Sequence, residues 1–306
     1  MTAFRALRLV LAGTTVLLLA GVGILAQTQP MLPSAPKKAF GASISPAWDG
    51  WYHNEDGGFT FLMGYYSRNT KAEVDVPIGP DNHFEPGEPD RGQPTHFYPG
   101  RNFGMFSIKV PKGYPPGERI WWVLTVNGVT QRIPMHLQSD FTITPFEASE
   151  ESPGGKYNKP AVLRFSENGP ALQGPVASLQ NAASKEAVAG VPMTLDFWVE
   201  DDALWSNGSN APSSREEPLV EMVIGKYRGP GNVTVGDGHH KLTTLKGGKR
   251  AEPYAGKGST TLTFSEPGDY QIHVTANDLS GPGGGATGCC WTTGLVKVAV
   301  KPATTK

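Results

Sequence analysis

The sequence predicts an all-β protein built from two β-sandwich domains. The 306 residues include 38 glycines and 27 prolines, about a fifth of the chain, which favours many turns over long helices. Short runs of β-branched and aromatic residues recur between these turns. Seven Trp, nine Tyr and 13 Phe supply enough apolar side chains for hydrophobic cores, so the composition excludes a chain that is disordered throughout.

Residues 1–26 have the pattern of a signal peptide. Arg5 and Arg8 precede an apolar run from Leu9 to Ala26 that carries no charge. We expect cleavage after Ala26, although the bulk of Ile24 leaves an uncleaved N-terminal anchor open, which is the one membrane contact we expect. Residues 27–39 are rich in proline and polar side chains and are interpreted as a flexible spacer. The predicted location is therefore exported, periplasmic or extracellular.

The charge of the chain argues against a nucleic-acid partner. Removing residues 1–26 takes away two arginines and no acid, which changes the net charge from −1 to −3. The sequence also has no block of lysines or arginines, and so we expect no nucleic acid to bind.

Residues 40–145 are predicted to form the N-terminal β-sandwich. Alternating apolar side chains in two of its runs indicate half-buried antiparallel strands. The dipeptide Asn127-Gly128 favours a tight hairpin turn, because both residues tolerate positive φ. The four expected strands are 59–67, 73–78, 105–110 and 120–126.

Two parts of this half are candidates for binding. The polar segment 77–102 carries Asp90, Gln93 and His96, and it is either a functional loop, a loop packed by its own hydrogen bonds, or a region of missed short strands. The stretch WDGWYHNEDGG, 48–58, places three aromatic residues beside acids, as carbohydrate-binding faces do, although tryptophans in small sandwiches are more often core residues. Its tentative ligand-binding residues are Trp48, Trp51 and Tyr52.

The acidic and then proline-glycine stretch 147–156 favours a boundary, and residues 146–184 are interpreted as a linker containing a short strand at 162–165. Residues 185–301 are predicted to form the second sandwich, followed by a tail at 302–306. Its clearest unit is a hairpin at 259–281, in which Tyr270, Ile272, Val274 and Ala276 are expected to face inward and Gln271, His273, Thr275 and Asn277 outward. The other expected strands are 191–202, 219–224 and 295–300.

This second half resembles the PKD-like and cadherin-like modules of the immunoglobulin fold. The stretch TFSEPGDYQIHVTANDLSG is similar to their penultimate hairpin, AGVPMTLDFWVEDD to their second strand, and GKYRGPGNVTV to their Gly-Pro-Gly stretch, with Tyr227 present and the expected tryptophan absent. The resemblance covers about residues 185–301 and implies an immunoglobulin-like fold but no activity. The order of GWYHNEDG, GYYSRN, GQPTHF, GPG and CCWT resembles a group of exported bacterial proteins of unknown function, which implies two β domains and a secreted location.

The sequence contains no recognisable catalytic arrangement. There is no Gly-x-Ser-x-Gly motif, and the histidines at 53, 83, 96, 136, 239, 240 and 273 have no catalytic spacing. The sequence therefore favours a protein without enzymatic activity, although it does not decide whether the protein is an enzyme. No cofactor is expected, apart from calcium as a weak candidate. The modules named above sometimes hold calcium at strand ends, and here the matching oxygen ligands are Glu200, Asp201, Asp202 and Asp278. His239 and His240 are a weaker candidate pair for a transition metal.

Cys289 and Cys290, the only cysteines, are adjacent in the glycine-rich run GGGATGCCWTTG. An oxidising compartment favours a disulfide, and glycine on the N-terminal side makes the backbone of a vicinal disulfide easier to reach. The alternatives are reduced cysteines buried beside Trp291, which is also a tentative ligand-binding residue, and a metal or interchain role.

The functional hypothesis is an exported, non-enzymatic binding or structural protein of the periplasm or cell surface, whose ligand or cell-surface partner the sequence does not name. The alternative is a carbohydrate-binding or carbohydrate-active protein that uses the N-terminal aromatic residues and the segment 77–102. A structural subunit is a third possibility, and it predicts concentration-dependent assembly.

Overall fold

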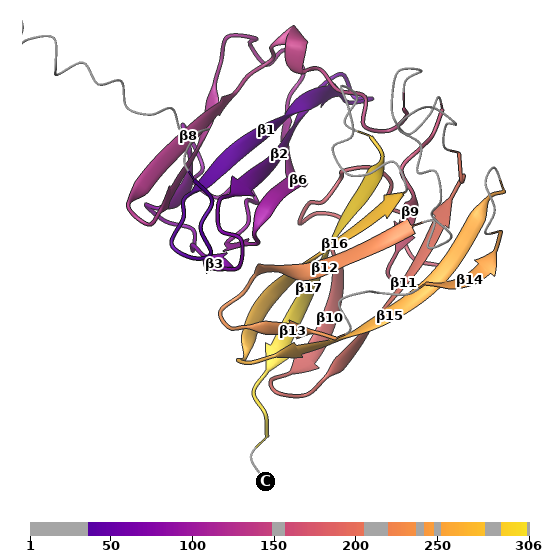
Figure 1. The fold of residues 1–306 in the computed structure, drawn as a ribbon. Coiled ribbons are helices and arrows are strands. Elements are labelled where there is room, and N and C mark those ends of the chain that lie inside the picture. Colours follow the sequence, from indigo (N-terminus) through magenta and orange to yellow (C-terminus); the bar gives the residue numbers. More distant parts are fainter. Residues whose placement is uncertain are drawn as a thin grey trace, which may run out of the picture. The chain divides into compact units, whose positions relative to one another are not determined.

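The computed structural model describes residues 36–148, 157–204, 220–236, 242–247, 252–278 and 289–304. Residues Lys38–Lys306 belong to one compact unit, and the predicted signal segment lies outside the described residues. The regular elements of the described part of the chain are strands joined by loops, apart from one short 3-10 turn (Figure 1). Within it, no helix has the length and apolarity needed to cross a membrane. The all-β prediction is confirmed, and the predicted domain boundaries stay a prediction.

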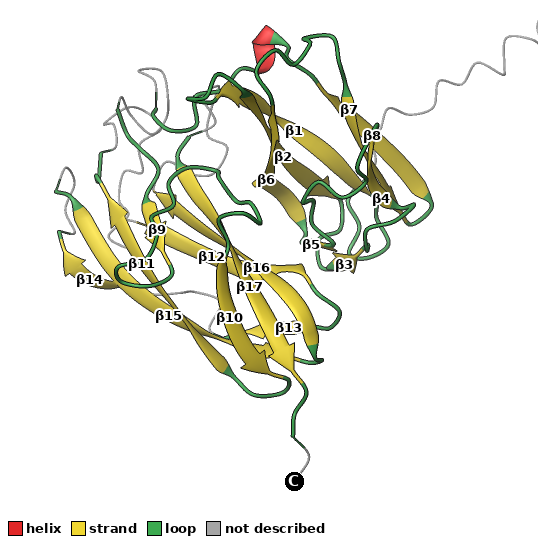
Figure 2. Ribbon diagram, turned by 180° about the vertical axis from the view of Figure 1, so that it is seen from behind, coloured by secondary structure: helices red, strands yellow, loops and turns green. Residues whose placement is uncertain are grey.

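The first half of the compact unit contains two three-stranded antiparallel sheets and a short two-stranded pairing. The first sheet has the order β1 (Ile44–His53), β2 (Phe59–Ser67), β6 (Gly100–Val110). The second has the order β4 (Asn82–Glu85), β7 (Ile120–Val126), β8 (Val129–Met135). The small pairing joins β3 (Val74–Asp75) to β5 (His96–Phe97). The short 3-10 turn Ser139–Phe141 follows β8 (Figure 2).

Trp122 lies at the centre of the first core and organises the long polar segment. Its ring is fully buried against the rings of Phe84, Phe97 and Phe106. Its indole Nε1 donates to Asn82 Oδ1 at 2.9 Å. The Asn82 amide in turn donates to the carbonyls of Val76 at 2.9 Å and Pro94 at 2.8 Å. Through Asn82, the buried Trp122 thus holds the polar segment at Val76, just before it begins, and at Pro94.

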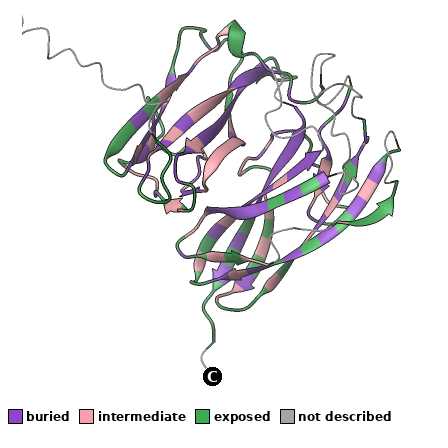
Figure 3. Ribbon diagram, in the orientation of Figure 1, coloured by how far each residue is buried: buried purple, intermediate pink, exposed green. Residues whose placement is uncertain are grey.

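The second half contains a four-stranded and a five-stranded sheet. The first has the order β10 (Ala183–Val188), β17 (Trp291–Lys301), β16 (Gly268–Asp278), β12 (Val220–Arg228), with β10 and β17 parallel. The second has the order β13 (Val233–Val235), β15 (Tyr254–Phe264), β11 (Met193–Asp201), β9 (Val162–Arg164), with β14 (Thr243–Lys246) also on β15. Burial alternates along β15, as a sheet with one covered face requires (Figure 3). Leu195, Phe197 and Val199 of one sheet share a core with Ile272 and Val274 of the other, so the two sheets form a sandwich.

Several local predictions agree with the structure and several do not. The strands at 59–67 and 120–126 have the expected bounds, and the expected hairpin turn has φ of 52° at Asn127 and 73° at Gly128. The strand expected at 73–78 is wrong in length, since only Val74–Asp75 pairs before Pro77, which has no N–H to donate. The segment 77–102 contains β4 and β5, which confirms that short strands were missed there, and the alternative of a functional loop stays a prediction.

The outward face expected for β16 is wrong at two positions. Tyr270, Ile272, Val274 and Ala276 are buried as predicted, but so are His273 and Asn277 on the opposite face. The ring of His273 stacks on Tyr227, with centroids 5.6 Å apart. Leu295 of the same sheet belongs to the core of the first half. Both faces of this sheet are therefore covered, and alternation alone gives no sign of the second cover.

Candidate functional site

Among the predicted aromatic ligands, Trp48 is the one that reaches the surface. Its ring is half-buried and stacks on Phe141, with centroids 4.4 Å apart and planes 14° apart. Phe141 is 41% exposed, and the ring of His136 lies 5.3 Å from Trp48 on another side. Burial and the neighbouring Arg119 hold the pKa of His136 below its ordinary value, which favours the neutral ring. We call Trp48, His136 and Phe141 the aromatic cluster.

Trp51 and Tyr52 are interior residues. Trp51 is buried, and its indole Nε1 donates to the carbonyl of Gln138 at 2.7 Å. Tyr52 is buried in a small cluster that also contains Trp291, another predicted ligand, and burial raises the pKa of the Tyr52 hydroxyl to about 12. The structure thus brings Tyr52 and Trp291 together, away from the ring of Trp48.

A β-bulge between Trp48 and Gly50 creates a buried ion pair that sequence reasoning missed. The extra residue, Asp49, accepts from Arg101 and from the backbone N–H of Gly104 at 2.8 Å. Burial raises the pKa of Asp49, and the Arg101 charge opposes that effect. The glycine at position 50, whose φ is 124° in the structure, is the available signal in the sequence for this bulge.

Asp90 and Gln93 of the polar segment are bound to β12 rather than directed into a cavity. The Arg228 guanidinium donates to both oxygens of Asp90, at 2.9 and 2.7 Å, and from Nε to the carbonyl of Gln93 at 2.8 Å. Hydrogen bonds from Arg228 hold the pKa of Asp90 below its ordinary value. The hydroxyl of Tyr227 donates to the carbonyl of Gly92 at 2.5 Å. These groups fasten the segment 77–102 to the second sandwich.

His96 takes part in a second contact of the same kind. Its Nδ1 lies 3.0 Å from an oxygen of Asp75, and its Nε2 lies 3.2 Å from Glu73. Lys226 of β12, whose side chain is only 4% exposed, donates to the same oxygen of Asp75 at 2.9 Å. Burial alone raises the pKa of Asp75, but hydrogen bonds from Lys226 and His96 outweigh it and the net shift is downward. A buried lysine needs such a partner, so these residues hold the fold together.

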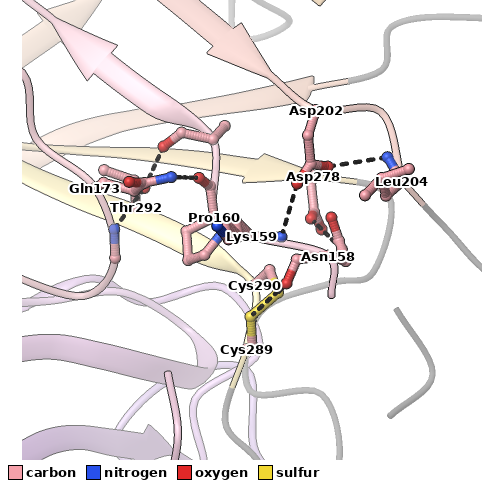
Figure 4. Close-up of a disulfide and its surroundings, with 12 residues drawn as sticks. Asn158, Lys159, Pro160, Gln173, Asp202, Leu204, Asp278, Cys289, Cys290 and Thr292 are labelled. Atoms are coloured by element: carbon pink, nitrogen blue, oxygen red, sulfur yellow. Dashed lines mark hydrogen bonds between the residues drawn. A yellow bond between two sulfur atoms is a disulfide. The ribbon is translucent and has the colours of Figure 1, made fainter. Parts of the chain in front are cut away.

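Cys289 and Cys290 form a vicinal disulfide that is buried among the described residues (Figure 4). The carbonyl oxygen of Asn158 lies 3.4 Å from Cys290 Sγ, and because a disulfide sulfur carries no proton this contact is not a hydrogen bond. The adjacent Trp291 ring passes over Gly104, where a Cβ would lie 2.5 Å from the ring. Gly104 has φ of 53°, so the chain uses a glycine for both its conformation and this close approach.

The four predicted calcium ligands have different surroundings, and the most exposed of them, Glu200, accepts from Arg164 at 2.7 Å. Asp202 accepts from the backbone N–H groups of Leu204 at 2.9 Å and Lys159 at 3.2 Å. Asp278 is buried and accepts from the Asn158 amide at 2.7 Å. Asp201 is buried, and burial together with the charges of Asp278 and Asp202 raises its pKa to about 8. In the described part of the chain, no group of three or more His, Cys, Asp or Glu is placed to hold a metal ion, and His239 and His240 lie outside that part.

A cavity of about 430 Å³ opens beside these acids. Glu200, Asp201 and Asp202 line it together with Lys159 and Lys246, so it presents both signs of charge. A second cavity of about 420 Å³ in the first half is lined by the loop that follows β3 and by the β7–β8 hairpin, residues 74–81 and 125–127. The charged side chains that line the first cavity make it the stronger candidate for a small charged ligand or ion.

Comparisons with known proteins show resemblance at the level of solved structures only. No protein-family model matches the sequence, and no curated protein matches it significantly. A PapD-like domain of human CEP192 is 11% identical with a TM-score of 0.24, covering 56% of this chain and all of that domain. Domains 4 and 5 of the S-layer protein SbsC are 10% identical with a TM-score of 0.19, covering 84% and 98% of the two chains.

A protein of unknown function from Porphyromonas gingivalis is also 10% identical with a TM-score of 0.19, covering 84% of this chain and 99% of that one. These identities and scores carry no argument about function. The site must therefore be interpreted from its own residues.

Proposed function

We propose that the chain is an exported, non-enzymatic binding or structural protein that acts in the periplasm or at the cell surface. The observation that carries this proposal is the use of the polar side chains of 77–102. Asp90 and His96, which are the residue types that catalysis requires, are instead held by Arg228 and Asp75 within the fold. Both ring nitrogens of His96 and both oxygens of Asp90 already contact other side chains, which supports a structural role for these two residues.

The vicinal disulfide supports the location. Disulfides persist in oxidising compartments and are rare in the cytosol. Both cysteines of the chain are used in this bond, and the pattern of residues 1–26 independently predicts export. The two signals come from opposite ends of the sequence and favour the same compartment.

The experiment separates location from binding. Cells that make the full chain are fractionated, and the purified chain from residue 38 onward is titrated onto washed cell envelopes. We expect the protein in the periplasmic or extracellular fraction and saturable envelope binding that unlabelled protein displaces, or concentration-dependent assembly in light scattering. A cytoplasmic protein, or a monomer with no saturable binding, contradicts the proposal.

The aromatic cluster favours carbohydrate as a second candidate ligand. Sugars stack on aromatic faces that are partly exposed, and the pair of Trp48 and Phe141 supplies such a surface on the first half. Trp48→Ala should abolish binding on a glycan array, while Trp198→Ala should not. Trp198 is the matched control because it is half-buried on β11 with Lys257 over its ring, outside the aromatic cluster. Silence of the native protein across the array counts against this candidate.

A further inference from the structure

Two buried oxygens beside Asp278 have no hydrogen-bond partner in the described part of the chain. They are Asp201 Oδ2 and Asn158 Oδ1. Asp201 is 8% exposed and Asn158 is 1% exposed, so both side chains are more than nine-tenths buried. An unpaired oxygen in such a place carries the full cost of its desolvation. Within the described residues, neither oxygen has the hydrogen-bond donor or cation that would offset this cost.

Asp278 connects these two oxygens. The Asn158 amide donates from Nδ2 to Asp278 Oδ2 at 2.7 Å, so Asn158 Oδ1, on the same amide, lies beside that carboxylate (Figure 4). Asp201 precedes Asp202, which accepts from the backbone N–H of Lys159, the residue after Asn158. Burial is the largest cause of the raised pKa of Asp201, and the Asp278 charge is the second. Asp201 ends β11 and Asp278 ends β16, so the two sheets of the second sandwich each bring one carboxylate to the same place. We call Asn158, Asp201 and Asp278 the oxygen cluster.

We propose that the oxygen cluster binds a calcium ion. Its side chains offer carboxylate and amide oxygens, which are the ligands of hard cations, and two carboxylates balance the two charges of the ion. Nitrogen or thiolate ligands, which transition metals prefer, are absent from these three residues. Magnesium requires a near-ideal octahedral shell and releases its waters reluctantly, whereas calcium tolerates an irregular set completed by water.

The cavity of about 430 Å³ gives the ion a route to the cluster. Asp201 lines that cavity, and Glu200 and Asp202 lie on the same wall and attract cations. Both oxygens of Asp202 already accept from backbone N–H groups, at 2.9 and 3.2 Å, so Asp202 lies at the rim and is not one of the ligands. With two carboxylates the affinity should be modest, with Kd on the order of 0.1–1 mM, as in other extracellular calcium sites.

The test compares Asp201→Asn with Asp202→Asn as a matched control. Thermal unfolding and calorimetric titration are run with calcium, with magnesium and with EGTA. In about 10 mM calcium, the native protein and Asp202→Asn should gain ~3–8 °C in Tm over EGTA, because the ion binds only the folded state. Asp201→Asn should lose that gain and should unfold no earlier than the native protein in EGTA, since the amide replaces a carboxyl group that is buried beside the Asp278 carboxylate.

A second readout does not depend on any variant. Terbium, which replaces calcium at oxygen sites, should emit when Tyr254 is excited, because Tyr254 is the strand neighbour of Asp201 on β15. Excess calcium should remove this emission and magnesium should not. No calcium heat, no Tm gain and no terbium emission in the native protein overturn the proposal, as does an equal loss in both variants. The result is independent of the proposed function, since export and envelope binding are measured without reference to calcium.

Discussion

Arg228 is the residue whose replacement tests most sharply how the segment 77–102 is fastened. Its side chain is 12% exposed, and it makes two hydrogen bonds to the Asp90 carboxylate and two to the carbonyl of Gln93. Asp90 is 46% exposed, so the ion pair itself is screened and contributes up to ~1 kcal/mol. The bonds to the more buried carbonyl add ~1–2 kcal/mol, because Arg228→Ala leaves that oxygen without its donor.

Arg228→Ala should therefore lower the free energy of unfolding by ~1–3 kcal/mol, or the Tm by ~2–12 °C. Urea denaturation of the native protein, both single variants and the double variant with Asp90→Asn completes a double-mutant cycle. We expect a coupling energy of about 1 kcal/mol and only partial rescue by Arg228→Lys, since lysine lacks the planar fork that meets both oxygens. Additive effects within ~0.3–0.5 kcal/mol show that the two side chains do not interact, which refutes the reasoning.

The same pair predicts a pH dependence with a definite sign. The Arg228 hydrogen bonds lower the pKa of Asp90 in the folded protein. The stability that Asp90 contributes is therefore present above its unfolded pKa and is lost as the pH falls through the lower folded value. Arg228→Ala should remove this acid-sensitive component, and urea titrations from pH 5 down to pH 2 measure it. An unchanged acid dependence contradicts the assignment of the shift to Arg228.

Two further predictions concern the interior. His273 is buried, and burial lowers its pKa to about 4. The free energy of unfolding should therefore fall as the pH drops from 6.5 to 4, by at most about 3 kcal/mol. His273→Phe should lack this pH-dependent component in urea titrations, while the phenyl ring still packs against Tyr227. Gly64→Ala should lower the free energy of unfolding by ~1–3 kcal/mol, because its Cβ would clash with the backbone carbonyl oxygen of Asn102 and would lie 2.6 Å from both Arg101 and Asp49 of the ion pair. Gly117→Ala is the matched control, since no atom lies within 4 Å of the added Cβ. Equal stability of the two glycine variants, or an unchanged pH profile in His273→Phe, contradicts these accounts.

Local pattern was sufficient for the elements whose side chains alternate. The hairpin of β15 and β16 and the burial of Tyr270, Ile272 and Val274 follow from period-two hydrophobicity and a Pro-Gly turn. The strand β10 was not recognised, because ASKEAV is half-exposed and has no apolar period. Its pairing with β17 is parallel and links distant parts of the chain, and no local signal specifies such a pairing.

The candidate site depended on contacts that no spacing reveals. The bulge at Asp49 shifts the register of β1, so that Trp48 and Trp51 pack on one core although a regular strand places them on opposite faces. Asn158 and Asp278 are 120 positions apart in the sequence. The sequence therefore indicated the acidic residues of the oxygen cluster but not Asn158. The polar residues of 77–102 were correctly identified as unusual, but their partners on β12 are more than 130 positions away.

The most direct test of the central claim, an exported protein with an oxidised cysteine pair, is the intact mass of the full chain taken from its own cells. The cells are lysed in an alkylating agent under denaturing conditions, with and without prior reduction. The account predicts a chain that starts after residue 26, carries no adduct without reductant and gains two adducts after reduction. A chain that retains residues 1–26 and carries adducts on both Cys289 and Cys290 without reduction contradicts it.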